Sequence, residues 1–356
     1  MKKIFLIIPL AFVLLFSCDR EEFNSDNSVA VVEYPLANIA SLKEAPYPIG
    51  GALTPNNLKN NTAYRQTVIN EMTSMTSENA MKMANISRGR KQYFWDDVDY
   101  LVNFGVENKM RVHGHTLIWH NSTPAWITSF VGTKEDWKLI MKEYIQDVVG
   151  RYKGKIKSWD VVNEVIDDNG VLRESLWKKN IGEEYIALAF QYAHEADPDA
   201  ILFYNEYGHE YSAPRRLAVY QLAMKLKAEN APINGLGLQM HVPVTRSEAD
   251  IRYAIFSASK TGLKIHVSEL DVALNPSKSK SFVLTDELLQ QQKNVYRYAA
   301  KAMMELPVEQ QYGITFWGVA DSNSFLSSGP DFPAVFDFSY KRKLAYDGLL
   351  QGFYKK

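Results

Sequence analysis

Short apolar runs alternate along the chain with longer segments in which apolar residues recur every three or four positions. The short runs cover residues 49–53, 72–77, 110–118, 156–163, 201–204, 235–240, 264–268 and 313–318. The segments between them have a helical period, most clearly at residues 134–152, 183–195 and 287–304. This order predicts eight repeats of a strand followed by a helix, and therefore a parallel sheet.

Eight such repeats in roughly 320 residues predict an α/β fold of the (β/α)8 TIM barrel type, with its functional site at the carboxyl ends of the strands. An open doubly wound sheet would produce a similar alternation. It lacks support, because no glycine-rich fingerprint follows the first strand. No linker, low-complexity run or short repeat interrupts the chain after about Tyr34, so we expect residues 35–356 to form one domain.

The start of the chain has a different pattern. Two lysines precede an unbroken apolar run, residues 4–16, which ends at Ser17 and Cys18. A basic start and an apolar run this short are typical of a secretory signal rather than a membrane span. Residues 15–18 also resemble the lipobox of bacterial lipoproteins, in which the cysteine becomes the lipidated first residue. We therefore expect a lipoprotein signal peptide at 1–17 and a lipidated Cys18 heading a polar tether at 18–34; the alternative is an ordinary cleaved signal.

The residues that follow Cys18 are acidic, and this cluster resembles the surface-export signal of lipoproteins in glycan-degrading Gram-negative bacteria. The expected location is the cell envelope, with the lipid at Cys18 in the outer membrane; the acidic cluster favours the surface side, and the periplasmic side is the alternative.

The composition of the chain argues against several classes of protein. The chain has 40 basic and 41 acidic side chains, whereas a nucleic-acid binder needs a surplus of Lys and Arg gathered on one face. Aromatic residues make up 12% of the chain, which with near-zero net charge argues against disorder. Cys18 is the only cysteine, so an internal disulfide framework and a cysteine-based zinc or iron–sulfur site are excluded.

Polar and aromatic side chains gather where the predicted strands end. Glu164 and Glu269 each follow a strongly apolar strand, the fourth and the seventh, and these strands face each other across a barrel mouth. Glycoside hydrolysis requires two carboxylates in one cleft, one of them with a pKa raised by burial. Taken alone, each glutamate fits a capping or salt-bridge role better. Neighbouring Trp, Asn, Gln and His residues favour a sugar site, because aromatic faces stack on sugar rings and amides bind hydroxyls.

Six segments in this region carry a resemblance to a known family. They are Glu-Asn-Ala-Met-Lys (78–82), His-Thr-Leu-Ile-Trp-His (115–120), Trp-Asp-Val-Val-Asn-Glu (159–164), Gly-Leu-Gln-Met-His (237–241), Ser-Glu-Leu-Asp (268–271) and Phe-Trp-Gly-Val (316–319). In this order they resemble motifs of glycoside hydrolase family 10, the endo-β-1,4-xylanases. The resemblance extends from about Leu36 to the C-terminus and implies that residues 35–356 are the catalytic barrel.

The resemblance implies a role for each matching residue. Glu164 would be the general acid/base and Glu269 the nucleophile of a retaining hydrolysis of xylan. The residues that would support this pair are Asn163, which would hold the sugar 2-hydroxyl, His241, Asp271, Gln239 and Asp160. The residues that would bind the sugars are Glu78, Asn79, Lys82, His115, Trp119, Trp317 and Phe325.

Three departures from the family pattern fall in the expected sugar-binding shell: His113 stands where Arg is common, Ser122 where Gln is common, and Phe325 where Trp is common. Phe325 is a smaller platform and lacks the indole N–H. These three departures would affect which lengths of xylan chain the protein prefers and whether it accepts side branches on that chain. They leave the expected reaction type unchanged.

Other interpretations stay open. The His-x-His pattern of His113 and His115 occurs in some metal-binding barrels, so a metal-dependent hydrolase is one alternative. A surface lipoprotein that binds glycans without catalysis is another, and a third is the same chemistry on branched xylan or another β-1,4-glycan. The favoured hypothesis needs no metal or cofactor and predicts a monomer that binds xylan or xylo-oligosaccharides.

Overall fold

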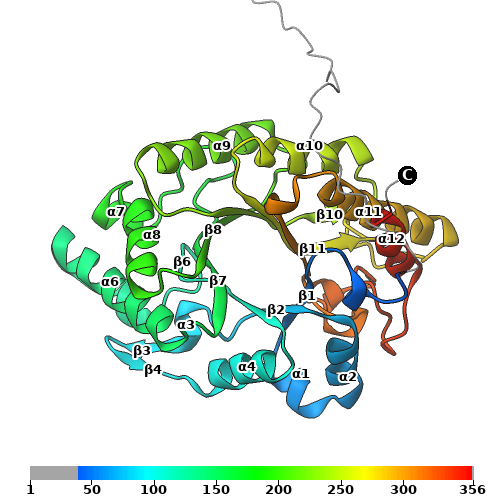
Figure 1. Cartoon of the computed structure of the whole chain (residues 1–356), viewed down its shortest axis with the longest axis horizontal. Coiled ribbons are helices and arrows are strands. Elements are labelled where there is room, and N and C mark those ends of the chain that lie inside the picture. The colour runs from blue at the N-terminus through cyan, green and yellow to red at the C-terminus, as the bar shows by residue number, and fades with distance from the viewer. Residues whose placement is uncertain (1–38, 355–356) are drawn as a thin grey trace, which may run out of the picture. The chain divides into compact units, whose positions relative to one another are not determined.

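The computed structural model describes residues 39–354, without the side chains of residues 327 and 328. The predicted signal peptide, Cys18 and the tether lie outside the described residues. Within them, eight parallel strands close into a barrel, because β9 pairs with both β8 and β11 (Figure 1). The barrel strands are β1 (Ile49–Leu53), β2 (Ser74–Ser77), β5 (Arg111–Gly114), β7 (Ile156–Asn163), β8 (Ile201–Glu206), β9 (Gly235–Leu238), β11 (Lys264–Ala273) and β12 (Gln311–Phe316). The (β/α)8 prediction is therefore confirmed.

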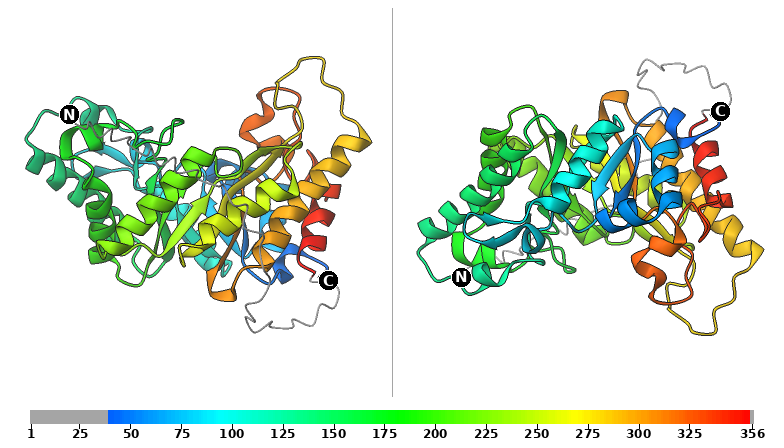
Figure 2. Two further views of the ribbon diagram at one scale, coloured as in Figure 1. Left: turned by 90° about the horizontal axis from the view of Figure 1, so that it is seen from above. Right: turned by 90° about the horizontal axis from the view of Figure 1, so that it is seen from below.

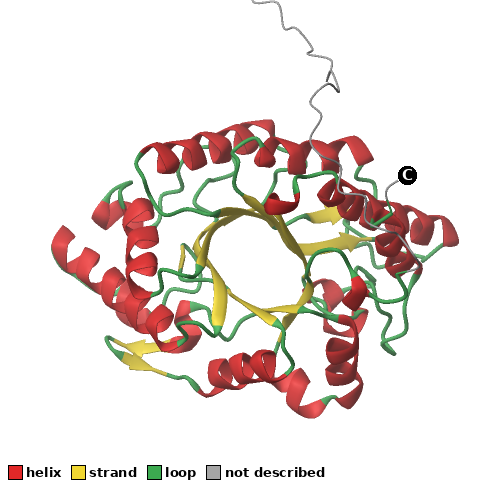
Figure 3. Ribbon diagram, viewed as in Figure 1, coloured by secondary structure: helices red, strands yellow, loops and turns green. Residues whose placement is uncertain are grey.

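Helices surround the ring of strands on its outer side (Figure 3). They are α1 (Pro55–Asn60), α2 (Thr62–Glu71), α3 (Met83–Ile86), α4 (Asp96–Glu107), α5 (Ala125–Thr128), α6 (Lys134–Arg151), α7 (Leu176–Ile181), α8 (Tyr185–Ala196), α9 (Ala213–Ala228), α10 (Glu248–Ser259), α11 (Asp286–Met304) and α12 (Leu344–Gly352). Short strands lie outside the barrel order: β6 (Ile118–Trp119) and β10 (His241–Pro243) extend it, and β3 (Ser87–Gly89) pairs with β4 (Gln92–Tyr93). No described helix is long and apolar enough to cross a membrane.

Helix α6 shows how the sequence pattern produces these elements. Thr133 and Asp136 form a reciprocal capping box, in which the main-chain N–H group of each residue donates to the side chain of the other. Seven apolar residues spaced three and four apart, from Trp137 to Val149, are buried against the barrel, whereas Leu139 is exposed. The helical periods predicted for 183–195 and 287–304 correspond in the same way to α8 and α11.

The predicted strand ends need correction at functional positions. β8 and β11 continue beyond the predicted 201–204 and 264–268, to Glu206 and Ala273, so Asn205 and Glu269 lie within strands rather than after them. An apolar pattern misses these residues because they are polar, yet their main chains still pair with the neighbouring strand. The run 110–118 instead divides into β5 and β6, and the peptide bond between His115 and Thr116 is cis.

The inside of the barrel is partly polar, and it contains His113. This side chain is wholly buried; its Nδ1 lies 2.6 Å from Ser158 Oγ and its Nε2 lies 3.1 Å from Asp160 Oδ2. Its ring also packs against Phe203 and His266. The expectation that His113 belongs to the sugar-binding shell is therefore wrong. It sits on β5 two residues before His115 and points into the same interior, one layer deeper.

Helix α12 closes the outer layer by packing directly on α11 (Figure 2). The contact needs a glycine, because a Cβ on Gly348 would lie 2.1 Å from the main-chain oxygen of Lys293 in α11. Gly150, near the end of α6, has no atom within 4 Å of the corresponding position. Gly348 and Gly150 thus differ in whether an added methyl group has room.

We expect Gly348→Ala to lower the free energy of unfolding by about 1–3 kcal/mol, because α12 must move away from α11 to admit the methyl group. Gly150→Ala is the matched control and should leave stability equal or raise it by up to about 1 kcal/mol, since alanine is the better helix former. Urea unfolding followed by circular dichroism measures both. Equal stability of the two variants would contradict the proposed packing constraint.

Candidate active site

A cavity of about 460 Å³ lies at the carboxyl ends of the barrel strands. Both predicted catalytic glutamates line it, together with aromatic and amide side chains from most of the barrel strands and their loops. Its lining consists of Lys82, His115, Trp119, His120, Asn121, Asn163, Glu164, Tyr207, Gly208, Tyr211, Gln239, His241, Glu269, Trp317 and Phe325. The structure therefore brings together most of the predicted site residues.

Glu164 follows the last residue of β7 and has a left-handed backbone conformation, with φ of 54°. This conformation is uncommon for residues other than glycine and is typical of functional positions. The main chain is held on both sides: its N–H donates to the Asn205 carbonyl over 3.0 Å, and its carbonyl accepts from Arg173 Nε over 2.9 Å. The backbone thus fixes the direction in which the carboxylate points.

The Glu164 carboxylate accepts two hydrogen bonds from cleft residues. Trp119 Nε1 donates to Oε2 over 2.9 Å, and Gln239 Nε2 donates to Oε1 over 3.0 Å. His120 Nδ1 lies further away, 3.8 Å from Oε2. Trp119 therefore contacts the predicted acid/base directly, in addition to its predicted role in sugar binding, and Gln239 supports the pair as expected.

Glu269 lies on β11 in a more enclosed environment. Asn205 Nδ2 donates to its Oε1 over 2.7 Å, and His241 Nε2 lies 3.1 Å from its Oε2. His241 Nδ1 in turn lies 2.8 Å from Asp271 Oδ2. The predicted support of Glu269 by His241 and Asp271 therefore has a geometric basis in one chain of contacts.

This chain of contacts controls the charge of Glu269. Burial raises the pKa of Glu269, but the hydrogen bond from His241 and the nearby His115 and His241 charges bring it below its ordinary value. Burial lowers the pKa of His241, but Asp271 and Glu269 outweigh this and hold it well above its ordinary value. The arrangement favours an ionised Glu269 beside a protonated imidazole.

Amide side chains join the two glutamates. Asn205 Nδ2 also donates to Asn163 Oδ1, over 2.9 Å, and Gln239 Nε2 approaches the same oxygen at 3.4 Å. Ser268 Oγ donates to Asn205 Oδ1 over 2.6 Å and so fixes which way this amide faces. Asn205 had no predicted role, although its place at a strand end was a visible signal.

Asp160 contacts His115, which lines the cavity beside the catalytic pair. Its Oδ2 lies 2.8 Å from His115 Nδ1, and its main-chain oxygen accepts from Thr116 Oγ1. Burial raises the pKa of Asp160, but the two histidines beside it, His113 and His115, bring it well below its ordinary value. Asp160 therefore orients His115, whose ring packs edge-on against Trp317 at 5.4 Å.

The His-x-His pattern thus has a structural explanation. His113 and His115 both approach the same oxygen of Asp160, one from inside the barrel and the other from the cleft. Among residues 39–354 no group of three or more His, Cys, Asp or Glu side chains is arranged to hold a metal ion.

The predicted sugar-binding residues of strand two form a connected group. Asn79 Nδ2 donates to Glu78 Oε1, and Lys82 Nζ donates to Asn79 Oδ1, each over 2.9 Å. Lys82 Nζ also lies over the Trp119 ring at 5.2 Å and the Trp317 ring at 5.7 Å. Burial lowers the pKa of Lys82, although the carboxylates around it oppose this effect.

Phe325 and Ser122, the other two departures from the family pattern, lie in different places. Phe325 is half exposed and packs edge-on against His241, with ring centroids 5.3 Å apart. Ser122 is not among the residues that line the cavity; its carbonyl accepts from the Ala84 N–H. Of the three departures, only Phe325 borders the catalytic cavity.

A group beside Glu164 was missed by the sequence analysis. Tyr207 and Tyr211 line the cavity, and the buried Arg215 lies 3.6 Å from the Tyr207 ring. Arg215 Nη2 donates to the buried Glu206 over 2.6 Å and its Nη1 to Asp168 over 2.8 Å. The aromatic wall is therefore fixed from behind by ion pairs. Tyr207 directly follows the polar end of β8, which was its only sequence signal.

Two carboxylates of different environment at the mouth of a closed barrel are the arrangement that glycoside hydrolysis requires, and the match of the chain to a hydrolase family shows that it is a glycoside hydrolase. Residues 38–352 match Glycosyl hydrolase family 10. The chain belongs to this family.

Relatives of comparable length agree with this assignment. The chain is 36% identical to a "Beta-1,4-xylanase" of Dictyoglomus thermophilum, covering 86% of this chain and 90% of the relative. It is 34% identical to an "Endo-1,4-beta-xylanase" of Geobacillus stearothermophilus, covering 87% and 98%. Other relatives are far longer: the chain spans 30% of the "Exoglucanase XynX" of Acetivibrio thermocellus and 33% of the "Endo-1,4-beta-xylanase C" of Paenibacillus barcinonensis.

Solved structures show the same fold. Xylanase 10B from Thermotoga petrophila RKU-1 in complex with xylobiose has a TM-score of 0.82 at 33% identity, covering 89% of this chain and 98% of that one. The structure of GH10 from Paenibacillus barcinonensis also has a TM-score of 0.82, at 36% identity, covering 88% and 97%.

We expect His241→Asn to move the acidic limb of the kcat/KM profile to higher pH. The predicted nucleophile Glu269 must be ionised, so activity falls as the pH drops through its pKa. His241 lowers that pKa in the wild type, and without it burial raises the pKa. The measurement uses an aryl glycoside whose leaving group needs no protonation. His194→Asn, on the exposed side of α8, is the control, and an unmoved limb in the His241 variant would contradict the assignment.

Proposed function

We propose that the protein is a retaining endo-β-1,4-xylanase that hydrolyses internal xylosidic bonds of xylan by double displacement. The observation that carries this proposal is the different environment of the two glutamates in one cavity. Glu269 is enclosed and favoured as an anion, whereas Glu164 receives bonds only from neutral donors and its side chain remains 15% exposed to the cleft. An ionised nucleophile opposite a carboxyl that exchanges protons is what this chemistry requires.

In the first step Glu164 transfers its proton to the glycosidic oxygen while the bond from that oxygen to the anomeric carbon breaks. A carboxylate oxygen of Glu269 forms a bond to the same carbon and yields a covalent glycosyl–enzyme. In the second step the Glu164 carboxylate takes a proton from water, and the water oxygen displaces Glu269. Two inversions give net retention of configuration.

The surrounding residues support both steps. Protonated His241 stabilises Glu269 as an anion before attack and again when it leaves. Asn163 is fixed by Asn205 at the point between the two glutamates, which suits the proposed contact with the sugar 2-hydroxyl. Trp119 and Gln239 hold the Glu164 carboxylate in place without adding charge.

The named relatives support xylan as the substrate, since several of them are xylanases and one solved relative contains xylobiose. A relative named an exoglucanase, at 34% identity, favours testing another β-1,4-glycan as the second candidate. Parallel digestion of xylan and of a soluble β-1,4-glucan separates the two, because the proposal predicts faster turnover of xylan.

We expect Glu269→Ala to abolish hydrolysis of both xylan and an aryl xylobioside, because no nucleophile remains. Glu164→Ala should reduce hydrolysis of xylan far more than hydrolysis of an activated aryl xylobioside, whose leaving group departs without a proton. Steady-state kinetics on the two substrates measure this contrast. Substantial turnover by the Glu269 variant would overturn the nucleophile assignment, and equal losses in the Glu164 variant would overturn its role as the acid. A protein that only binds glycans would show no activity to lose.

We further propose that the protein is a monomeric lipoprotein of the cell envelope, anchored to the outer membrane through Cys18 and exposed at the surface. The support is the position of the only cysteine directly after a short apolar run and before an acidic segment. Residues 18–34 would then act as a tether between the membrane and the barrel.

We expect Cys18→Ser to shift the full chain, expressed in a Gram-negative host, from the membrane fraction to the soluble fraction. Ser25→Ala, in the proposed tether, should stay in the membrane fraction. Fractionation followed by activity assay measures the shift, and protease treatment of intact cells tests exposure at the surface. A wild-type chain found in the soluble fraction would contradict the anchor.

A further inference from the structure

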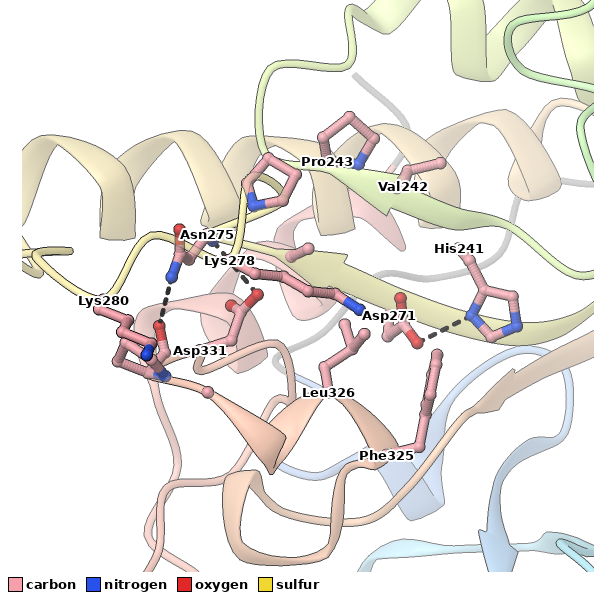
Figure 4. A pocket seen from close by; sticks show the side chains of 14 residues that line it. His241, Val242, Pro243, Asp271, Asn275, Lys278, Lys280, Phe325, Leu326 and Asp331 are labelled. Atoms are coloured by element: carbon pink, nitrogen blue, oxygen red, sulfur yellow. Dashed lines mark hydrogen bonds and ion pairs between the residues drawn. The ribbon is translucent and has the colours of Figure 1, made fainter.

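The two glutamates of the catalytic cavity are held from different sides. Glu269 is held at its carboxylate by His241, which contacts Asp271 in turn (Figure 4). Glu164 is also held through its main chain, because Arg173 Nε donates to the Glu164 carbonyl over 2.9 Å. The groups that fix the Arg173 side chain therefore also affect the direction of the Glu164 carboxylate.

The Arg173 guanidinium has three hydrogen-bond acceptors among the described residues. Besides the Glu164 carbonyl, its Nη2 donates to the Ile166 carbonyl over 3.0 Å and to the Tyr207 hydroxyl over 3.1 Å. The two carbonyls lie in the loop after β7, to which Arg173 itself belongs, whereas Tyr207 directly follows β8 and lines the catalytic cavity. The Tyr207 hydroxyl is therefore the contact that joins Arg173 to the neighbouring strand.

Asp168 fixes the direction of the Tyr207 hydroxyl. A phenolic hydroxyl has one proton to donate, and Tyr207 donates it to Asp168 Oδ1 over 2.7 Å. The lone pairs of the hydroxyl oxygen are then free to accept from Arg173. Burial raises the pKa of Tyr207 and the hydrogen bond to Asp168 raises it further, against the opposing effect of Arg173, so the hydroxyl keeps its proton. A chain of hydrogen bonds of this kind strengthens its members.

Asp168 is held in place although its side chain is 81% exposed. Arg215 Nη1 donates to the same Oδ1 over 2.8 Å, and Arg215 is itself anchored by the buried Glu206. Two residues after Asp168, Gly170 packs on the first turn of α9, where an added Cβ would lie 2.9 Å from Pro214. The loop after β7 is therefore held against α9 both at Asp168 and at Gly170.

We propose that Asp168 is a positioning residue for proton transfer by Glu164. Through the Tyr207 hydroxyl it orients Arg173, and Arg173 holds the main chain of Glu164 in the left-handed conformation that directs its carboxyl into the cavity. Asp168 is not among the residues that line the cavity, so it acts through its neighbours. This inference rests on the proposed retaining mechanism and adds a residue to its first step.

The test compares two aryl xylobiosides. The phenyl substrate has a leaving group that needs a proton, and the dinitrophenyl substrate has one that departs without a proton. The readout is the ratio of kcat/KM for the phenyl over the dinitrophenyl substrate, measured with one enzyme preparation. A loss of folded enzyme lowers both values by the same factor and leaves the ratio unchanged, so the ratio reports the proton transfer.

We expect Asp168→Ala to lower this ratio by about threefold, in line with the small contribution of exposed charged contacts. Asp168→Asn keeps an oxygen that accepts from Tyr207, so it should retain most of the ratio. Glu174→Ala is the matched control. Glu174 lies in the same loop, is 76% exposed and pairs with Lys178 of α7, so its removal should leave the ratio unchanged.

Tyr207→Phe tests the route by which Asp168 acts, because it keeps the ring and removes the hydroxyl. In the Tyr207→Phe background, Asp168→Ala should lower the ratio no further. The same threefold loss in both backgrounds, or an unchanged ratio in the single Asp168→Ala variant, would refute the proposal. Both outcomes require a wild type that hydrolyses the two substrates. A wild type that hydrolyses neither would instead refute the proposed xylanase function, so the two failures are distinguishable.

Discussion

The active site depends on the amide of Asn205. Its nitrogen donates both to Glu269 on β11 and to Asn163 on β7, and Ser268 fixes its oxygen. One buried side chain on β8 therefore ties together three strands at the end where the catalytic glutamates lie. A buried amide that lost one of these partners would leave a polar group unsatisfied, so the interaction restricts the register of all three strands as well as the direction of Glu269.

The same barrel gives its two glutamates opposite electrostatic surroundings. Glu269 faces an imidazole that Asp271 keeps protonated, whereas Glu164 receives only neutral donors and is held through its main chain in a left-handed conformation. The buried pair of Arg215 and Glu206 lies behind the aromatic wall next to Glu164 and confines its charges away from the cleft. The Glu269 carboxylate therefore contacts a charged imidazole, whereas the hydrogen bonds to the Glu164 carboxylate come from the uncharged side chains of Trp119 and Gln239.

The sequence predicted the barrel and the two glutamates because both leave periodic or local signals: alternating apolar runs, and short motifs at strand ends. The sequence did not predict how deep a side chain lies in the barrel, nor which residues distant in sequence surround it. His113 lies on β5 and His115 directly after its end, and only the closed barrel shows that His113 lies below the cleft against Ser158. Asn205 gained its role from strands distant in sequence.

His241 lies between two buried carboxylates of β11. On one side its Nε2 approaches Glu269, and on the other its Nδ1 approaches Asp271. A near-neutral chain gives no hint of this, because a net charge of −1 averages over local charges that differ. Asp271 raises the pKa of the imidazole, and the imidazole lowers the pKa of Glu269, so Asp271 acts on the charge of Glu269 through His241.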